Sequence, residues 1–347
     1  MKDVIIVGWL NKGKPADCGE TMKNQLIVGK LEEMNIKCRQ VDFKGWRRHP
    51  WVFIEFAWNL VMHRKSTLIL STSAQNVYFL MKAMKKIRWK QNTVHWVIGG
   101  SLGQKIRQGT YDANVINYMR HTLVESSYMA EQLKECNVDG VLYVPNFKPI
   151  RYYPTLPVRF PAGKMIRFVF MSRIMPEKGC DYILEAVRLL NEKGYSSMLS
   201  VDFYGKIAEN YKAVFSRKTD RLSNVNYKGF LNLMENKGYD TLASYDLMLF
   251  PTYWKGEGFA GIFVDAFISG LPIIATDWAH NKAFLREKET ALFIPVHNVC
   301  ALADTMQACM DGRYNIQEMR SLCQKEAEKY NIDHVITEDL MKEIGVL

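Results

Sequence analysis

The chain has 347 residues, of which 48% are hydrophobic and 24% charged, so we expect a globular protein long enough for two domains. No apolar run approaches the roughly 18 residues of a membrane-spanning helix, and we see no targeting segment before the first predicted strand. The seven cysteines are scattered and include no C-x-x-C pair, which argues against a structural zinc site and for a reducing cytosol. The sequence therefore predicts a cytoplasmic protein.

The net charge of +10 is unevenly placed along the chain. Residues 1–160 hold 24 Lys and Arg against 12 Asp and Glu, whereas residues 161–347 hold 22 against 24. From Lys44 to Lys90 there are ten basic residues and one acid, Glu55, with tryptophan and phenylalanine between them. This mixture is typical of a surface that rests on anionic lipid. We therefore expect the protein to bind peripherally to the inner face of the plasma membrane through this stretch. A plain solvated basic face is the alternative, and nucleic acid is not expected as a partner.

The first 150 residues alternate between predicted strands and helices. A strand over 4–7 leads through a glycine and a polar loop into a helix over 20–31. Further strands, separated by apolar helical patterns, are expected at 38–43, 67–71 and 93–98. Alternation of this kind predicts a parallel sheet covered by helices on both faces.

Two loops of this first domain follow the carboxyl ends of predicted strands, where open sheets bind their ligands. The first loop contains Cys18 and Gly19, and the second begins with Gly99 and Gly100. For the first loop a plain connection is the alternative, since the chain has no G-x-G-x-x-G fingerprint. His95 would lie inside a strand, where a histidine is more often a packed core residue than a catalyst.

A proline-rich stretch without helical period marks a linker over 151–164. A second α/β domain begins with a strand at 167–171, a loop carrying Arg173 and Lys178, and a helix over 181–193. Two cations five residues apart on a loop that leads into a helix could clamp a diphosphate from two sides. Taken alone, the loop is equally consistent with two solvated side chains. Further strands at 199–204 and 225–230 and helices at 300–311 and 316–329 complete this domain.

The most informative stretch is residues 247–275, which we interpret as strand, loop, helix and strand. Apolar residues from Phe259 recur at i, i+3, i+4, i+7 and i+8, as on one face of an amphipathic helix. Glu257 stands at the start of this helix, and Gly258 and Asp265 lie on its other side, where a ligand could approach the backbone. The two carboxylates would be about 12 Å apart, which suits a ligand with a polyol at each end and a diphosphate between. A tight helix–sheet contact with two solvated carboxylates is the alternative.

This stretch resembles the signature of the retaining, family-4-type glycosyltransferases of the GT-B fold. In that signature a Glu, seven residues and a second Glu flank a Gly-Phe-Gly start of a helix, shortly before a Gly-x-Pro. Here the motif begins Glu257-Gly258-Phe259-Ala260, has its second acid at Asp265, and is followed by Gly-Leu-Pro. It departs from the family in having an aspartate for the second Glu and an alanine for the second Gly.

The resemblance implies an α/β protein of GT-B architecture, with two Rossmann-like domains facing across a cleft. We expect an acceptor-side domain at 1–150, the linker, a nucleotide-sugar domain at 165–332, and a terminal helix at 333–347 that crosses back to the first domain. No cofactor is implied beyond the nucleotide-sugar donor, which is a substrate.

The resemblance also implies roles for individual residues. Arg173, Lys178 and Gly179 match the family's R-x-x-x-x-K-G element, and the two cations would neutralise the leaving diphosphate. Glu257 would bind sugar hydroxyls and complete the catalytic set with these cations, while Asp265 would bind the ribose. Because the positive charge is built into the protein, no metal site is expected.

Other family positions map onto glycines and aromatic residues of this chain. The donor would also contact Gly205, Gly229, Phe230, Gly258, Phe259 and Ala260. Cys18 and Gly19 take the place of the family's paired glycines near the acceptor and phosphates. Gly99 and Gly100 fall where related enzymes often have a histidine, so a catalytic histidine is unassigned.

The predicted function is transfer of a sugar from a nucleotide-diphosphate sugar to a glycan or lipid-linked acceptor, with retention and without metal. A lipid diphosphate suits the basic first domain, as in bacterial surface-polysaccharide assembly. Two alternatives stay open: a catalytically silent relative that binds glycan or nucleotide as a partner subunit, and a nucleotide-sugar epimerase. Turnover would exclude the first, and the identity of the product would decide the second.

Overall fold

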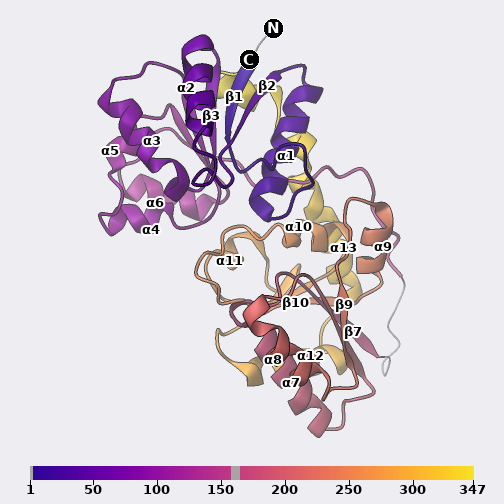
Figure 1. Cartoon of the computed structure of the whole chain (residues 1–347). Coiled ribbons are helices and arrows are strands. Elements are labelled where there is room, and N and C mark those ends of the chain that lie inside the picture. Colours follow the sequence, from indigo (N-terminus) through magenta and orange to yellow (C-terminus); the bar gives the residue numbers. More distant parts are fainter. Residues whose placement is uncertain (1–2, 158–164) are drawn as a thin grey trace. The chain divides into compact units, whose positions relative to one another are not determined.

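The computed structural model describes residues 3–157 and 165–347, which fall into two compact units (Figure 1). Unit 1 consists of Met1–Pro149 and Tyr330–Leu347, and unit 2 of Ile150–Lys329. Part of the expected linker, residues 158–164, lies outside the described residues. The preceding residues pack on unit 2, where Tyr152 donates to Asp240 and Tyr153 donates to Glu328.

Unit 1 is built on a six-stranded parallel sheet with the order β2-β1-β3-β4-β5-β6. Its strands are β1 (Asp3–Gly8), β2 (Lys37–Asp42), β3 (Thr67–Thr72), β4 (Thr93–Val97), β5 (His121–Val124) and β6 (Val141–Tyr143). The central strands are runs of β-branched and aliphatic residues, because helices cover both faces of the sheet. Along β1, Ile5 and Val7 enter one buried cluster, and Val4 and Ile6 enter the cluster on the opposite face.

The helices of unit 1 divide between these two clusters. They are α1 (Gly19–Glu33), α2 (Val52–Met62), α3 (Ala74–Lys86), α4 (Leu102–Arg107), α5 (Ala113–Ile116), α6 (Ser127–Glu135), α14 (Ile332–Val335) and α15 (Glu338–Glu343). The prediction of a single terminal helix over 333–347 is wrong, because two short helices, α14 and α15, form there with a non-helical segment between them. Thr337 begins the second of these helices, where its hydroxyl accepts a hydrogen bond from the amide of Leu340 at 3.2 Å.

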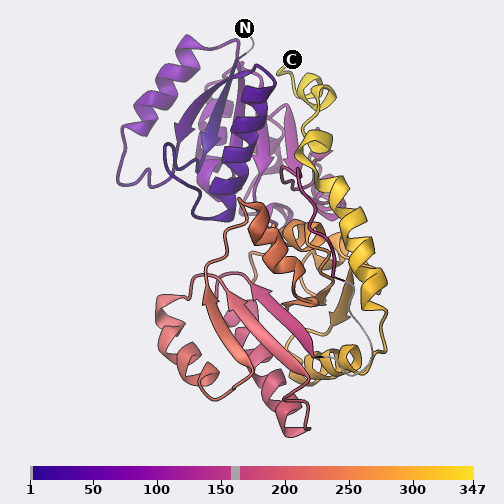
Figure 2. The same cartoon turned by 90° about the vertical axis from the view of Figure 1, so that its right-hand side faces the viewer.

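Unit 2 has a second six-stranded parallel sheet, with the order β12-β11-β10-β7-β8-β9, whose strands run side by side in Figure 2. The strands are β7 (Ile166–Met171), β8 (Leu199–Tyr204), β9 (Val225–Gly229), β10 (Leu247–Phe250), β11 (Ile273–Thr276) and β12 (Ala291–Ile294). The direction in which successive strands are added reverses between β7 and β10. In open α/β sheets this switch point is where ligands bind, outside the carboxyl ends of the strands.

The helices of unit 2 cover its sheet on both sides. They are α7 (Cys180–Glu192), α8 (Lys212–Thr219), α9 (Asn236–Ala243), α10 (Ile262–Ile268), α11 (Asn281–Phe284), α12 (Val299–Met310) and α13 (Ile316–Ala327). Three short 3₁₀ turns are at Pro176–Lys178, Glu209–Tyr211 and Glu328–Tyr330. The predicted α/β class, with two parallel sheets, is confirmed. Within the described ranges, no helix has the length and apolarity needed to cross a membrane.

Helix α10 differs from its prediction in two ways. It begins at Ile262 rather than at Phe259, because Phe259 packs outside the helix against the ring of Phe284, with the ring centroids 4.2 Å apart. Every residue from Phe263 to Ile268 is buried, so the helix has no exposed polar face. The periodicity of its apolar residues indicated a helix correctly but not that both of its sides are covered.

Candidate active site

The candidate site of unit 2 lies on two loops at the switch point of the sheet. One loop follows β7 and contains Arg173 and Lys178, and the other follows β10 and contains Glu257. The loops are joined directly, because the amide of Tyr253 donates to the carbonyl of Glu177 at 2.9 Å. The sheet therefore brings together two sequence motifs that lie about eighty residues apart.

Gly179 allows the two loops to approach each other. Its φ is +81°, in the left-handed region that favours glycine. A Cβ at this position would lie 2.2 Å from the carbonyl oxygen of Pro251, closer than any side chain tolerates. The glycine of the R-x-x-x-x-K-G element is thus required by backbone geometry as well as by space.

Lys178 and Glu257 form an ion pair where the two loops meet, with Nζ 2.6 Å from Oε2. The hydroxyl of Thr252 also donates to Oε2, at 2.9 Å. Only 13% of the lysine side chain and 8% of the glutamate side chain are exposed, and Nζ lies 5.8 Å from the centre of the Phe250 ring. Packing and hydrogen bonds therefore fix both side chains, and each charge is compensated by the other.

Arg173 and three of the predicted donor contacts, Gly205, Gly229 and Phe230, lie on neighbouring loops at the same edge of the sheet. Arg173 is exposed, and no described residue pairs with its guanidinium. Gly205 follows β8 with a φ of +133°, and a Cβ there would lie 1.9 Å from the carbonyl of Ser172. The amide of Gly205 donates to the carbonyl of Gly229 at 2.8 Å, and Phe230, which comes next, is 82% exposed. The loops after β7, β8 and β9 therefore converge.

The predicted glycine-rich turn supplies backbone donors beside Glu257. Gly258 is half-buried and Ala260 is buried, and in the described part of the chain no acceptor engages the amide of either residue. Phe259, between them, turns its ring into the core. Unpaired backbone amides are donors that an oxyanion can accept from.

Asp265 lies in the interior of α10 rather than at the loop surface, and only 3% of it is exposed. The phenol of Tyr239, on α9, donates to its carboxylate at 3.0 Å. Burial, followed by the nearby charge of Asp265, raises the pKa of this phenol well above its usual range. Tyr239 is thus a fixed donor to Asp265, and the sequence motif gave no signal for it.

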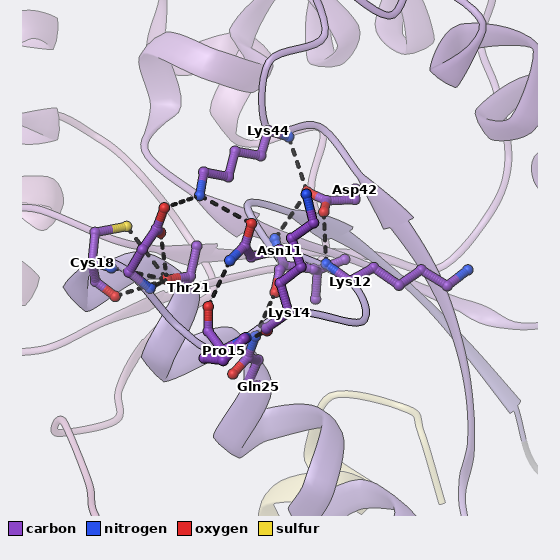
Figure 3. Close-up of polar contacts among 11 residues, drawn as sticks. Asn11, Lys12, Lys14, Pro15, Cys18, Thr21, Gln25, Asp42 and Lys44 are labelled. Carbon is purple, nitrogen blue, oxygen red and sulfur yellow. Dashed lines mark hydrogen bonds and ion pairs between the residues drawn. The ribbon is translucent and has the colours of Figure 1, made fainter. Parts of the chain in front are cut away.

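The first loop of unit 1 is held by a network of polar contacts (Figure 3). The carboxylate of Asp42 accepts hydrogen bonds from the backbone amides of Leu10 at 3.0 Å and Lys12 at 2.9 Å. The ammonium of Lys44 donates to the side chain of Asn11 at 3.1 Å and also pairs with Asp17. These contacts fix the shape of a loop whose lysine side chains are exposed.

The predicted acceptor residues lie at two positions on the sheet edge of unit 1. Cys18 is the N-cap of α1, and its amide donates to the hydroxyl of Thr21 at 3.1 Å, as Figure 3 shows. Gly19 is the first residue of α1 and not a loop residue as expected. Gly99 has a φ of +94° with open space beside it, and Gly100, like Gly99, is half-buried.

His95 is confirmed as a core residue. It lies fully buried in β4, and its Nε2 is 3.2 Å from the carbonyl oxygen of Thr72. Burial lowers its pKa to about 4, so the imidazole is neutral at physiological pH.

Sequence reasoning missed several residues of these sites. Glu20, at the start of α1, accepts a hydrogen bond from the hydroxyl of Thr72, at the switch point of unit 1 between β1 and β3. Burial raises the pKa of this carboxyl to about 7. In unit 2, the indole of Trp278 donates to the carbonyl of Trp254 at 2.9 Å and so braces the loop before Glu257. A surface depression of about 560 Å³ lies between α8 and β9, but no predicted site residue lines it.

One family model matches this chain within unit 2, and curated relatives match about half of the chain. Residues 166–311 match the family model of group 1 glycosyl transferases. The GtfA subunit of a UDP-N-acetylglucosamine–peptide N-acetylglucosaminyltransferase from Streptococcus parasanguinis is 28% identical over 179 residues, which cover 50% of this chain and 34% of that protein. The chain spans between 34% and 42% of the length of the curated relatives that it matches.

Solved structures extend the likeness to the whole chain. Sucrose-phosphate synthase from Thermosynechococcus elongatus superposes with a TM-score of 0.76 at 12% identity, over 99% of both chains. HepE from Anabaena in complex with UDP superposes with a TM-score of 0.71 at 13% identity, over 100% of both chains. The chain has the GT-B fold. The segment that matches the group 1 family model spans all six strands of unit 2 and includes Arg173, Lys178 and Glu257.

Proposed function

We propose that the chain transfers a sugar from a uridine-diphosphate sugar to a glycan or lipid-linked acceptor, with retention of configuration and without a metal ion. The observation that carries this proposal is the Lys178–Glu257 pair on two joined loops at the switch point of unit 2. The group 1 match over this unit supports glycosyl transfer. The choice of uridine rests on one relative, a subunit of a UDP-N-acetylglucosamine–peptide N-acetylglucosaminyltransferase, and on one structural neighbour, HepE in complex with UDP.

In this proposal the leaving diphosphate is stabilised by charges that are already in place. Arg173 is exposed and unpaired among the described residues, and Lys178 lies at the meeting point of the two loops. The free amides of Gly258 and Ala260 add donors beside them. Fixed donors of this kind lower the energy of a transition state in which negative charge grows on the phosphate.

Glu257 and Lys178 would exchange partners when the donor binds. Without donor, each neutralises the other. With donor, the ammonium would turn to the phosphate and the carboxylate to the sugar hydroxyls, so neither charge stays buried without a partner. Glu257 would then position the sugar ring, and Lys178 would stabilise the negative charge on the phosphate oxygen of the leaving group.

The nucleoside would lie against the loops after β8 and β9. Open space lies beside Gly229, and the exposed ring of Phe230 offers a face on which a base can stack. Asp265 would bind the ribose hydroxyls with Tyr239 as its fixed neighbour. Since Asp265 is buried, this role requires the ribose to enter deeply or a water to bridge the gap.

The acceptor would bind unit 1 near Cys18, Gly19, Gly99 and Gly100. A lipid diphosphate at an anionic membrane would suit the basic stretch that begins at Lys44, although Lys44 itself pairs with Asp17. Retention would be seen as an unchanged anomeric configuration in the NMR spectrum of the product. Metal independence would be seen as full activity in the presence of EDTA.

The proposal is tested by UDP release from a panel of UDP-sugars with lipid-linked and free glycan acceptors. Lys178→Ala and Arg173→Ala should each abolish release while their circular dichroism stays native. The matched controls are Lys193→Ala and Arg188→Ala, whose side chains pair with carboxylates on the outer surface of unit 2. Full activity in either site variant would contradict the proposal that Arg173 and Lys178 bind the diphosphate. Donor binding without turnover would favour a silent subunit, and a free sugar isomer as product would favour an epimerase.

A further inference from the structure

Helix α2 of unit 1 is apolar on the side that faces solvent. Five large apolar side chains lie on this outer face, and 56% to 75% of each is exposed: Trp51, Ile54, Trp58, Val61 and Met62. Successive members of this set are three, four, three and one residues apart. On an α-helix this spacing places all five within an arc of about 100° around the helix axis. The outer stripe of a surface helix is normally polar, so this stripe is not explained by the fold of unit 1.

The opposite side of α2 provides the packing that the fold requires. Val52 and Phe56 are buried against the sheet, and the ring of Phe53 packs edge-on against Phe43, with the centroids 5.5 Å apart. The ring of Phe53 also packs on Phe79 of α3, with the centroids 5.9 Å apart. Since the inner side already anchors α2, the outer apolar side chains are available for another surface.

Cationic side chains flank this apolar stripe along the chain and occur on the neighbouring helix α3. The exposed residues Arg47, Arg48, Arg64, Lys65, Lys82 and Lys86 lie before α2, after it and on α3. Arg47 lies over the ring of Trp46 at 5.5 Å and Arg64 over the ring of Trp89 at 4.7 Å, so two of the cations are held beside aromatic rings. Glu55 is the single acid between residues 44 and 90. The surface is therefore apolar at its centre and positive around it.

We propose that α2 docks unit 1 on an anionic phospholipid bilayer. The helix has 11 residues and is about 16 Å long, too short for the roughly 30 Å hydrocarbon core, so it lies along the interface. The apolar stripe enters the headgroup boundary, where tryptophan is favoured, and the surrounding cations contact anionic headgroups. The sequence-based expectation of a membrane surface rested on basic residues interleaved with tryptophan and phenylalanine, and in this proposal α2 is the element that inserts.

Charge also argues against the other occupants of this surface. A second copy of the chain related by two-fold symmetry would place two positive rims against each other, which is unfavourable. A protein partner would need an acidic rim around an apolar centre. A bilayer containing anionic lipid offers both properties over a continuous surface. The docking surface does not depend on the chemistry proposed for unit 2.

Vesicle flotation tests this proposal with phosphatidylcholine alone and with equal parts of phosphatidylcholine and phosphatidylglycerol. The protein should float with the anionic vesicles, bind the neutral ones far more weakly, and detach as salt is raised. Trp58→Glu should lower binding to the anionic vesicles by about tenfold or more, since it removes apolar area and adds a charge that the lipid repels. Met234→Glu is the matched control, because Met234 is 71% exposed on unit 2, and it should leave binding unchanged.

Three outcomes would overturn the proposal. The first is equal flotation of the original protein and Trp58→Glu. The second is a dimer, seen by sedimentation, that Trp58→Glu dissociates without any change in lipid binding. Thermal unfolding and UDP binding of Trp58→Glu should match the original protein, which separates failure at the membrane surface from failure of the proposed donor site. A lower melting temperature in this variant would mean that the stripe serves the fold and would contradict the proposal.

Discussion

Lys178 and Glu257 carry opposite charges in a place that water scarcely reaches, and each depends on the other. We predict that Glu257→Gln lowers the free energy of unfolding by about 2–4 kcal/mol, because it leaves a buried ammonium unpaired. The double variant Lys178→Met/Glu257→Gln should lose clearly less than the sum of the two single changes. Urea unfolding of the four proteins measures this coupling. Additive losses would mean that the 2.6 Å contact contributes nothing.

Glu20 makes the stability of unit 1 depend on pH. Its carboxyl has a pKa of about 7 in the folded protein against an ordinary value near 4.5, so folding favours the protonated form. Below about pH 4.5 the carboxyl is protonated in both the folded and the unfolded protein, so it does not reduce stability. As the pH rises from there through 7, the unfolded protein loses this proton more readily than the folded one, and the free energy of unfolding falls. Glu20→Gln should therefore stabilise the protein at pH 8 by up to about 3 kcal/mol and change little at low pH. Identical pH profiles of unfolding for the two proteins would contradict this.

Among the elements, the two loops at the switch point depend on one glycine. Gly179→Ala should destabilise the protein by about 2–4 kcal/mol, through the left-handed φ and the clash with Pro251. Gly194→Ala is the matched control: its φ is +89°, but nothing lies within 4 Å of the added Cβ, so only the cost of backbone strain remains, about 1 kcal/mol. Denaturant unfolding should separate the two variants. Equal losses would mean that the loops are not packed as closely as the structure has them.

Local sequence pattern predicted some elements well and others poorly, for physical reasons. Strand β8 has the predicted bounds of 199–204, because its apolar residues alternate with Ser200 and Asp202 and a glycine follows it. The start of α10 was misplaced by three residues, because the period of its apolar residues continues backwards into Phe259. That ring packs on Phe284, a tertiary contact that periodicity does not contain.

For the whole molecule, sequence patterns suggest candidate site residues but do not contain the contacts between them. The pairing of Lys178 with Glu257 requires β7 and β10 to be neighbours, and strand order is not encoded in any local window. The burial of Asp265 against Tyr239 and the exposed side of α2 were missed for a related reason. A helix that is apolar on two sides does not reveal from its sequence which side enters the core.

The central claim, that the two loops at the switch point of unit 2 bind the donor, is tested most directly by hydrogen–deuterium exchange with and without UDP. Binding should slow exchange in peptides covering residues 172–179 and 251–261, where the free amides of Gly258 and Ala260 gain an acceptor. Lys178→Ala should remove this protection at the same concentration of UDP. Unchanged exchange in both segments at saturating UDP, or protection confined to unit 1, would contradict the account.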